Sequence, residues 1–153
     1  MQAVIVGETL LDAGALLSRF LAHVGDAGGV ASFAGQVRGG DTQTLTLTRL
    51  EPMTTREIEQ AVEDAVSRFG LTGAMVRHRV GAMGVGETIV FVATAAPHRR
   101  AAFEACDCLM DYLKTRAVFW KQETGAKGAR WIEPREQDYQ DAQRWENDRW
   151  SDA

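Results

Sequence analysis

The apolar residues of this chain switch repeatedly between helical spacing and strand alternation, and this switching limits the fold more than any other feature. Residues 54–70 place apolar side chains on one helical stripe that ends at Phe69. Residues 44–50, in contrast, alternate threonine with leucine, as a half-buried strand does. Interleaved helices and strands, some joined by short turns, favour an α+β fold with a largely antiparallel or mixed sheet and two long helices.

Glycine-rich turns are expected to join two pairs of strands. Gly39, Gly40 and Asp41 separate two strand-like segments, which predicts a hairpin. The segment GAMGVG (81–86) indicates a turn rather than a nucleotide-binding loop, because a strand and not a helix is expected after it. The predicted strands are 3–10, 29–39, 44–50, 73–81, 87–96, 119–123 and 130–133, and the predicted helices are 13–24, 54–70 and 98–117.

Capping residues mark both ends of the 54–70 helix. Thr54 or Thr55 is expected to cap its N-terminus, and Glu57 would complete a capping box with Thr54. Gly70 fits the position just after the last helical turn, which often needs a left-handed backbone.

Composition and charge exclude several classes of protein. With 153 residues, 45% apolar and 25% charged, the chain is expected to form a single globular domain. It contains no run of about 18 apolar residues, so no membrane span is expected. The net charge is −4, yet residues 77–130 hold nine Lys/Arg against five Asp/Glu. A local anion site is therefore expected, whereas general coating of nucleic acid is not.

The cysteines and histidines do not predict a metal site. Cys106 and Cys108 lie two residues apart on a predicted helix, so their side chains diverge by about 200°. Cys106 falls on the apolar stripe and is expected to act as a small hydrophobic residue. The three histidines lack metal-ligand spacing. Two close cysteines form no disulfide framework, which favours a reducing cytoplasm.

Basic residues open the helix predicted at 98–117. His98 and Arg99 stand where free backbone N–H groups and the helix dipole favour an anion, and arginine suits phosphate geometry. A solvated basic turn is the alternative. Arg38, which precedes a Gly-Gly turn, is by itself typical of a surface arginine.

Two lysines lie among residues typical of a core, in the segment MDYLKTRAVFWKQE (110–123). Lys114 borders the stripe of one helix, and Lys121 follows Phe119 and Trp120 in a predicted strand. A lysine beside apolar surface and other cations can lose its proton easily and act as a base or nucleophile. As an ammonium it can instead stabilise an oxyanion. No fixed spacing predicts that the two lysines meet, and both could simply extend to water.

Four segments together resemble a known family. They are ASFAGQVRG, HRVGAMGVGETIVFVATAAPHRRAAFEA, MDYLKTRAVFWKQE and RWIE, in order between about Gly29 and Arg135. They are similar to the large, catalytic subunit of molybdopterin synthase. The H-R-x-x-A-F and K-T-x-x-x-F-W-K patterns are the most specific of these matches.

The resemblance implies an activity, a partner and an assembly. The enzyme would convert cyclic pyranopterin monophosphate into molybdopterin by installing two dithiolene sulfurs, in molybdenum cofactor biosynthesis. The sulfur would arrive as a thiocarboxylate on the C-terminal glycine of a small ubiquitin-like subunit. A homodimer of large subunits within a heterotetramer, an α/β-hammerhead-type fold, and no bound cofactor are implied. No catalytic cysteine is required, because the partner supplies the sulfur.

The resemblance also implies residue roles. Lys114 would orient and activate the thiocarboxylate and Lys121 would assist proton transfer, although the sequence does not decide which lysine performs which step. The phosphate-bearing substrate would contact Gln36, Val37, Arg38, His98, Arg99, Gln122, Glu123 and Arg135.

The chain departs from the family pattern in two places. The segment RLEPMTT (49–55) replaces a more aromatic or histidine-containing stretch, which affects the substrate rim or dimer contact. We expect a family-like domain over residues 1–135 and a polar tail over residues 136–153. Tyr139, Trp145 and Trp150 could pack this tail on the body or on a partner, or the tail could be frayed.

Two other functions remain open at this point. The chain could be a non-enzymatic binding module for a ubiquitin-like protein, although the intact lysines and His-Arg pair argue against lost chemistry. It could also be an α+β nucleic-acid binder, but its strands lack stacking aromatics interleaved with Lys/Arg.

Overall fold

The computed structural model describes residues 1–147, and within them the chain forms two four-stranded sheets. The first sheet has the strand order β1-β4-β6-β2, in which β1 runs parallel to β4 and the other neighbours are antiparallel. The second has the order β5-β3-β7-β8 and is antiparallel throughout. The strands are β1 (Gln2–Gly7), β2 (Gly29–Gln36), β3 (Thr42–Arg49), β4 (Gly73–Arg79), β5 (Gly81–Gly84), β6 (Thr88–Ala96), β7 (Phe119–Gly125) and β8 (Gly128–Ile132).

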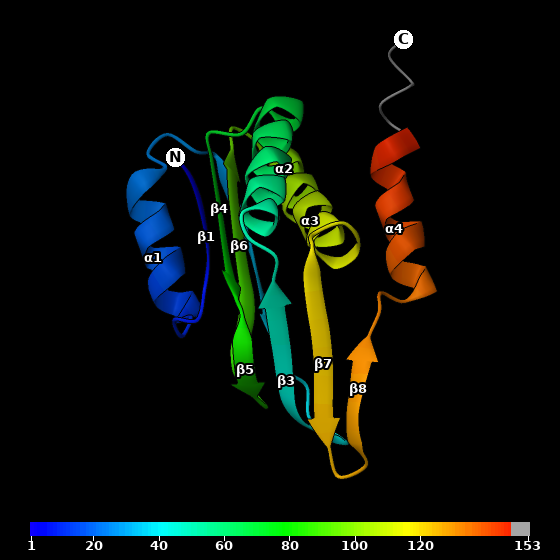
Figure 1. The fold of residues 1–153 in the computed structure, drawn as a ribbon. Coiled ribbons are helices and arrows are strands. Elements are labelled where there is room, and N and C mark those ends of the chain that lie inside the picture. The colour runs from blue at the N-terminus through cyan, green and yellow to red at the C-terminus, as the bar shows by residue number, and fades with distance from the viewer. Residues whose placement is uncertain (148–153) are drawn as a thin grey trace.

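Helices cover both faces of the first sheet (Figure 1). Phe20 of α1 packs with Met75 and Phe91 on one face. The stripes of α2 and α3 pack on the other, including Ile58 and Leu109. None of the helices in residues 1–147 is long and apolar enough to cross a membrane. The helices are α1 (Ala13–His23), α2 (Met53–Phe69), α3 (Arg99–Thr115) and α4 (Glu136–Asn147), and the α+β class with two long helices is confirmed.

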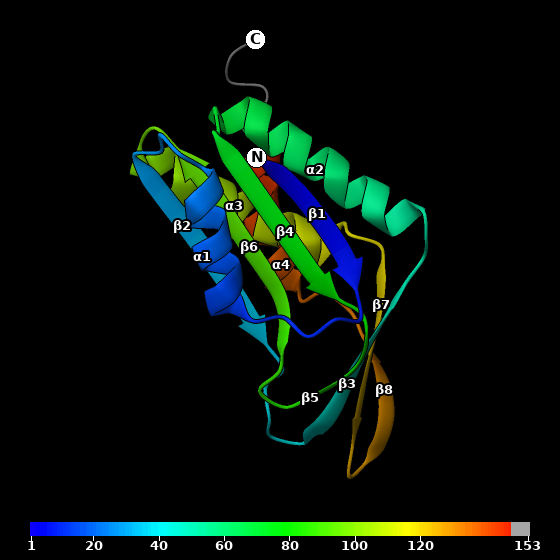
Figure 2. The ribbon, with the colours of Figure 1, turned by 90° about the vertical axis from the view of Figure 1, so that its left-hand side faces the viewer.

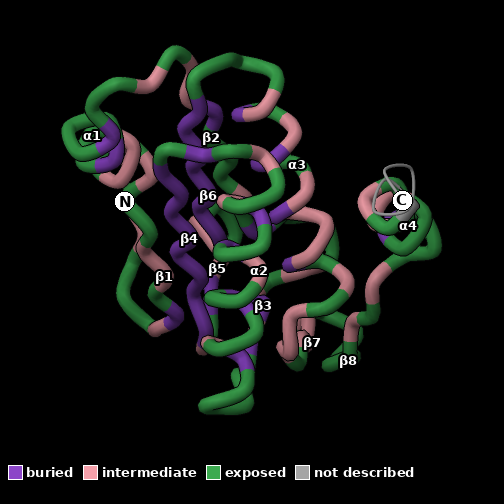
Figure 3. The backbone as a smooth tube through the Cα atoms, turned by 90° about the horizontal axis from the view of Figure 1, so that it is seen from above, coloured by how far each residue is buried: buried purple, intermediate pink, exposed green. Residues whose placement is uncertain are grey.

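The most buried strands lie between these helical layers (Figure 3). Every residue of β4, and every residue of β6 from Val90 to Ala96, is buried. A strand covered on both faces reads as a nearly continuous apolar run, which is the pattern of β6. The first sheet is therefore the core of the molecule.

The second sheet extends away from this core (Figure 2). Leu45 and Leu47 of β3 are buried, and they alternate with threonines as the sequence predicts. β7 and β8 form a hairpin, so the two short strands predicted near residues 120 and 131 are confirmed.

The predicted hairpin between residues 29–39 and 44–50 is wrong. β2 pairs with β6 in the first sheet, whereas β3 pairs with β5 and β7 in the second. Alternation identifies a strand but not its partner. The turn at Gly40, whose φ of 83° suits glycine, instead carries the chain from one sheet to the other.

Two local predictions also need correction. Residues 81–84 are not simply a turn, because they form β5 and pair with β3. The Thr54 capping box is absent: α2 begins at Met53, and the buried Thr54 hydroxyl donates to the Val118 carbonyl at 2.7 Å. Gly70 does end α2 in the left-handed conformation, as predicted.

The first part of the predicted polar tail forms α4, which packs along α3 (Figure 1). Arg144 donates to Asp107 and Asp111, and the Trp145 indole N–H donates to Asp111 at 2.7 Å. Trp145 therefore packs on the body of the protein. Tyr139 is exposed, and Trp150 lies outside the described residues.

Candidate active site

A cavity of about 1050 Å³ is lined by strands of both sheets and by the facing ends of α3 and α4. The C-terminal end of β2 and the segment after it form one wall. The inner face of β7, with β3 and β8 beside it, forms another. The cavity thus lies where the buried core meets the projecting second sheet.

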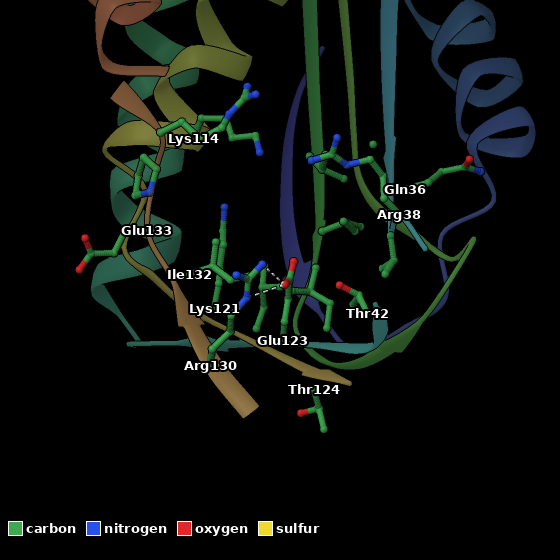
Figure 4. A pocket seen from close by; sticks show the side chains of 18 of the residues that line it. Gln36, Arg38, Thr42, Lys114, Lys121, Glu123, Thr124, Arg130, Ile132 and Glu133 are labelled. Atoms are coloured by element: carbon green, nitrogen blue, oxygen red, sulfur yellow. Dashed lines mark hydrogen bonds and ion pairs between the residues drawn. The ribbon is translucent and has the colours of Figure 1, made fainter. Parts of the chain in front are cut away.

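Lys114 and Lys121 reach this cavity from different elements (Figure 4). Lys114 is exposed near the end of α3, whereas Lys121 is half-buried on β7. Lys121 lies between Leu47 of β3 and Ile132 of β8 in the strand register. The fold therefore brings together two lysines that sequence spacing alone did not connect.

Burial changes the acidity of Lys121. Its pKa is lowered to about 8, first because burial removes water from the ammonium and second because Lys114 repels it, while Asp138 opposes the shift. At neutral pH the group is mainly an ammonium with a minor amine fraction. It can therefore stabilise an anion or transfer a proton close to physiological pH.

His78 forms an uncharged polar wall of the same cavity. It is buried, its Nδ1–H donates to the Arg79 carbonyl at 2.9 Å, and its ring stacks on Phe119 at 4.2 Å. Burial lowers its pKa to about 4, and the positive charges of Lys121 and Lys114 act in the same direction. His78 is therefore neutral at pH 7, with Nε2 unprotonated.

Two carboxylates of the cavity are paired with arginines. Glu123 accepts hydrogen bonds from Arg130 at 2.9 and 3.1 Å. Asp138 accepts from the Arg135 guanidinium at 3.1 Å and from the Arg135 backbone N–H at 2.8 Å. These pairs fix the two acids in place, and neither Lys114 nor Lys121 belongs to them.

The residues after β2 bring a further cation to the opposite wall. Val37 is buried, and its backbone N–H donates to the Glu87 carbonyl at 3.0 Å, which anchors the segment. Arg38 follows at the cavity wall (Figure 4). With Lys114 and Lys121, it makes the cavity suitable for a phosphate-bearing or carboxylate-bearing ligand.

The structure brings most, but not all, of the predicted site residues together. Gln122 neighbours Lys121 on β7 but does not line the cavity, because successive strand residues point to opposite faces. His98 and Arg99 lie at the other end of α3 from Lys114, about 22 Å away along the helix. The predicted residues that line the cavity are Gln36, Val37, Arg38, Lys114, Lys121, Glu123 and Arg135.

Among the cavity residues that sequence reasoning missed, His78 and Asp138 are buried. His78 occupies the same face of β4 as Ala74 and Val76, so strand alternation could have placed it inward. Asp138 lies in a segment that was assigned to a polar tail, and only its spacing from Arg135 hints at a helix cap.

Neither cysteine contributes to this site. Cys106 is buried, and burial raises the pKa of its thiol to about 11, with Asp107 adding to the effect. Within residues 1–147, no three His, Cys, Asp or Glu side chains cluster as metal ligands would.

Comparison with known proteins shows which family the chain is similar to. The family described as "MoaE protein" matches residues 6–116. The molybdopterin synthase catalytic subunit of Caulobacter vibrioides is 50% identical over 137 residues, 88% of this chain and 91% of that protein. The corresponding Escherichia coli subunit is 43% identical over 130 residues, 82% of this chain and 87% of that protein.

Solved structures agree with these sequence matches. The molybdopterin biosynthesis MoaE protein from Burkholderia ambifaria superposes with a TM-score of 0.82 at 34% identity, covering 95% of this chain and 99% of that one. A Helicobacter pylori complex of subunits 1 and 2 of molybdopterin-converting factor, 21% identical, shares the fold with a TM-score of 0.71 over 88% of this chain and 90% of that one. The resemblance found in the sequence is confirmed, and the chain belongs to the MoaE family, alongside curated molybdopterin synthase catalytic subunits.

Proposed function

We propose that this protein converts cyclic pyranopterin monophosphate into molybdopterin, with sulfur delivered by the C-terminal thiocarboxylate of a small ubiquitin-like subunit. The convergence of Lys114 and Lys121 on one cavity carries the proposal, since both ligands of this reaction are anionic. The family relationship supports the reaction, and the Helicobacter pylori complex of two subunits supports the partner.

The two lysines take different roles because their surroundings differ. Lys114 is exposed at the rim, where its ammonium orients the thiocarboxylate of an entering C-terminus. Lys121 lies deeper, and its lowered pKa suits delivery of a proton to the side-chain oxygen of the pterin that leaves as the carbon–sulfur bond forms and the carbon–oxygen bond breaks. Water then cleaves the acyl–sulfur bond and leaves the partner with an ordinary carboxylate, so each product consumes two thiocarboxylates.

The other cavity residues contribute to substrate binding in this proposal. Arg38 and Arg135 attract the phosphate, while Gln36, Val37 and Glu123 border the pterin. His98 and Arg99 are too far along α3 to reach the same cavity, so a second copy of the chain would have to supply them. Gln122 would contribute only through the backbone of β7. A homodimer that works in the cytoplasm is part of the proposal.

A reconstitution experiment tests the function. Purified protein is mixed with cyclic pyranopterin monophosphate and thiocarboxylated small subunit, and molybdopterin is measured as a fluorescent oxidised derivative in a single turnover. The matched control replaces the thiocarboxylate with the ordinary carboxylate form. Product that depends on the thiocarboxylate is expected, and its absence with retained partner binding would favour a non-enzymatic binding module.

Lysine variants test the site in the same assay. Lys114→Ala and Lys121→Ala are each expected to lower the single-turnover rate by roughly 100-fold or more, the range of a lost acid-base or oxyanion-stabilising group. Arg56→Ala, which removes an exposed cation on α2, is the matched control and should retain the wild-type rate. Near-normal rates in both lysine variants would remove the lysines from the mechanism.

A further inference from the structure

Asp138 is the most buried carboxylate of the cavity, and neither the sequence patterns nor the proposed reaction uses it. It is 8% exposed, in the first turn of α4, and it lines the same cavity as the two lysines. Arg135 holds it with its backbone N–H at 2.8 Å, Nη2 at 3.1 Å and Nε at 3.4 Å. Its position is therefore fixed by the connection between β8 and α4.

Helix capping explains only part of this arrangement. An acid at the third position of a helix often accepts a hydrogen bond from the capping residue's N–H, as Asp138 does from Arg135. A capping acid can perform that task while exposed to water. Asp138 instead turns into a cavity that contains two lysines, and its charge interacts with both of them.

The remaining charges around the cavity leave Asp138 as the buried counter-charge. His78 on β4 is neutral. Glu123 on β7 and Asp138 are each paired with an arginine, but Glu123 is only half-buried, whereas Asp138 is buried and its charge also acts on Lys114 and Lys121. Asp41 and Glu133 are exposed to water, which screens them. The other charged groups that line the cavity are cations: Arg38 after β2, Lys114 on α3, Lys127 in the β7–β8 turn, and Arg135 before α4.

We propose that Asp138 is a positioning residue of the sulfur-transfer site, whose fixed carboxylate balances the charge of the Lys114–Lys121 pair and sets the pH range in which the pair works. This inference rests on the proposed function. In this proposal α4 is part of the site, although its sequence predicts only a polar tail. Loss of the carboxylate leaves two like charges facing each other, which favours release of a proton from the more buried Lys121.

The titration of Lys121 tests the charge balance without any substrate. The chain contains three lysines, at positions 114, 121 and 127, so 13C-lysine labelling gives a simple NMR spectrum that Lys→Arg variants can assign. In Asp138→Asn the Lys121 midpoint is expected to fall by about half a pH unit or more relative to wild type, since an opposite charge nearby shifts a pKa on this scale. Asp138→Glu should restore most of the midpoint.

Two control variants separate charge from structure. Asp141→Asn removes the same charge from α4, but Asp141 accepts from Gln137 and does not line the cavity. Arg144→Gln removes the hydrogen bonds of Arg144 to Asp107 and Asp111 but keeps that of Trp145, so it should loosen α4 docking while leaving Asp138 in place. Both variants should keep the wild-type Lys121 midpoint. An equal fall in Asp141→Asn would show that any negative charge on α4 acts on Lys121, and an equal fall in Arg144→Gln would show that α4 docking controls Lys121. Either result would overturn the proposal.

The pH profile of the single-turnover rate completes the test. The inflection that belongs to Lys121 should move to lower pH in Asp138→Asn by the same amount as the NMR midpoint. An unchanged midpoint, or a shifted midpoint with an unchanged rate profile, would overturn the role of Asp138. Failure of the wild type to form product would instead contradict the proposed function, so the two failures are distinguishable.

Discussion

β6 and β7 are both inner strands of four-stranded sheets, but they differ in what covers them. β6 is covered by α1 on one face and by α3 on the other, and seven of its residues in succession, Val90 to Ala96, are buried. No residue of β7 is fully buried, and its inner face carries Lys121 and Glu123 into the cavity. We expect the covered strand to contribute stability, whereas the half-covered strand holds polar groups that are anchored yet accessible from the cavity.

This difference makes β7 a suitable place for a lysine that titrates close to physiological pH. A lysine buried as deeply as β6 would be too costly to charge, and a fully exposed lysine would keep its ordinary acidity. Lys121 lies between these limits, and its pKa of about 8 reflects partial burial. We therefore expect substitutions on β6 to change mainly the free energy of unfolding, and substitution of Lys121 on β7 to change mainly the reaction rate.

The largest effect on stability is expected at an aromatic residue of β6. Phe91→Ala should lower the free energy of unfolding by about 3–5 kcal/mol, because it opens a cavity beside Phe20 and Met75. Trp120→Ala on β7 removes a larger but 61% exposed side chain, and should cost only about 1 kcal/mol. Urea unfolding monitored by circular dichroism measures both. A similar cost at the two positions would contradict the comparison.

A smaller loss is expected where the two regions join. Thr54 is completely buried, and its hydroxyl donates to the Val118 carbonyl just before β7 and accepts from the Leu50 N–H at 2.9 Å. Thr54→Val should cost about 2–3 kcal/mol, since it leaves buried polar groups unpaired without changing volume much. Thr55→Val, one residue later and bonded only to Glu51, is the matched control in the same urea titration. Equal losses would show that the buried bonds do not matter.

His78 should make stability depend on pH. Its folded pKa of about 4 lies below the ordinary value of 6.5, so the unfolded chain takes up a proton first as the pH falls. Its contribution should therefore lower the free energy of unfolding by about 2 kcal/mol between pH 7 and pH 5. His78→Phe, which keeps a ring against Phe119, should show a correspondingly flatter dependence of the free energy of unfolding on pH. An unchanged slope in His78→Phe would show that His78 is not buried neutral.

The smallest effect on stability is expected at Lys121 itself. Since burial lowers its pKa to about 8, the folded state at pH 7 carries the cost of a partly desolvated ammonium. Lys121→Met should therefore raise the free energy of unfolding by about 1–2 kcal/mol at pH 7. The gain should shrink as the pH rises above 8, because wild type then loses that charge. Destabilisation at pH 7 would mean that Lys121 is structural.

The sequence predicted the elements better than their partners. The stripe of 54–70 and the apolar run of 87–96 identify α2 and β6, because local periodicity reports which faces are covered. The prediction of a hairpin between β2 and β3 was wrong because a Gly-Gly-Asp turn can equally well connect strands of two different sheets. Strand pairing depends on distant residues, which a local pattern does not contain.

The site was predictable only in part for the same reason. The resemblance to a family indicated Lys114 and Lys121, whereas spacing alone did not predict that they meet. Asp138 escaped notice because its burial depends on α4 docking through Arg144 and Trp145 onto α3, more than 30 residues earlier. His78 escaped notice because its surroundings include Phe119 and Lys121 from another sheet and Lys114 from α3.

The most direct measurement compares rate and stability in the same two variants. Single-turnover molybdopterin formation and urea unfolding are measured for Lys121→Met and Phe91→Ala at a temperature where both remain folded. Lys121→Met should lose roughly 100-fold or more in rate without losing stability, and Phe91→Ala should lose stability while its folded fraction keeps a rate near wild type. A Lys121→Met rate within a few-fold of wild type would contradict the role of Lys121 in the reaction.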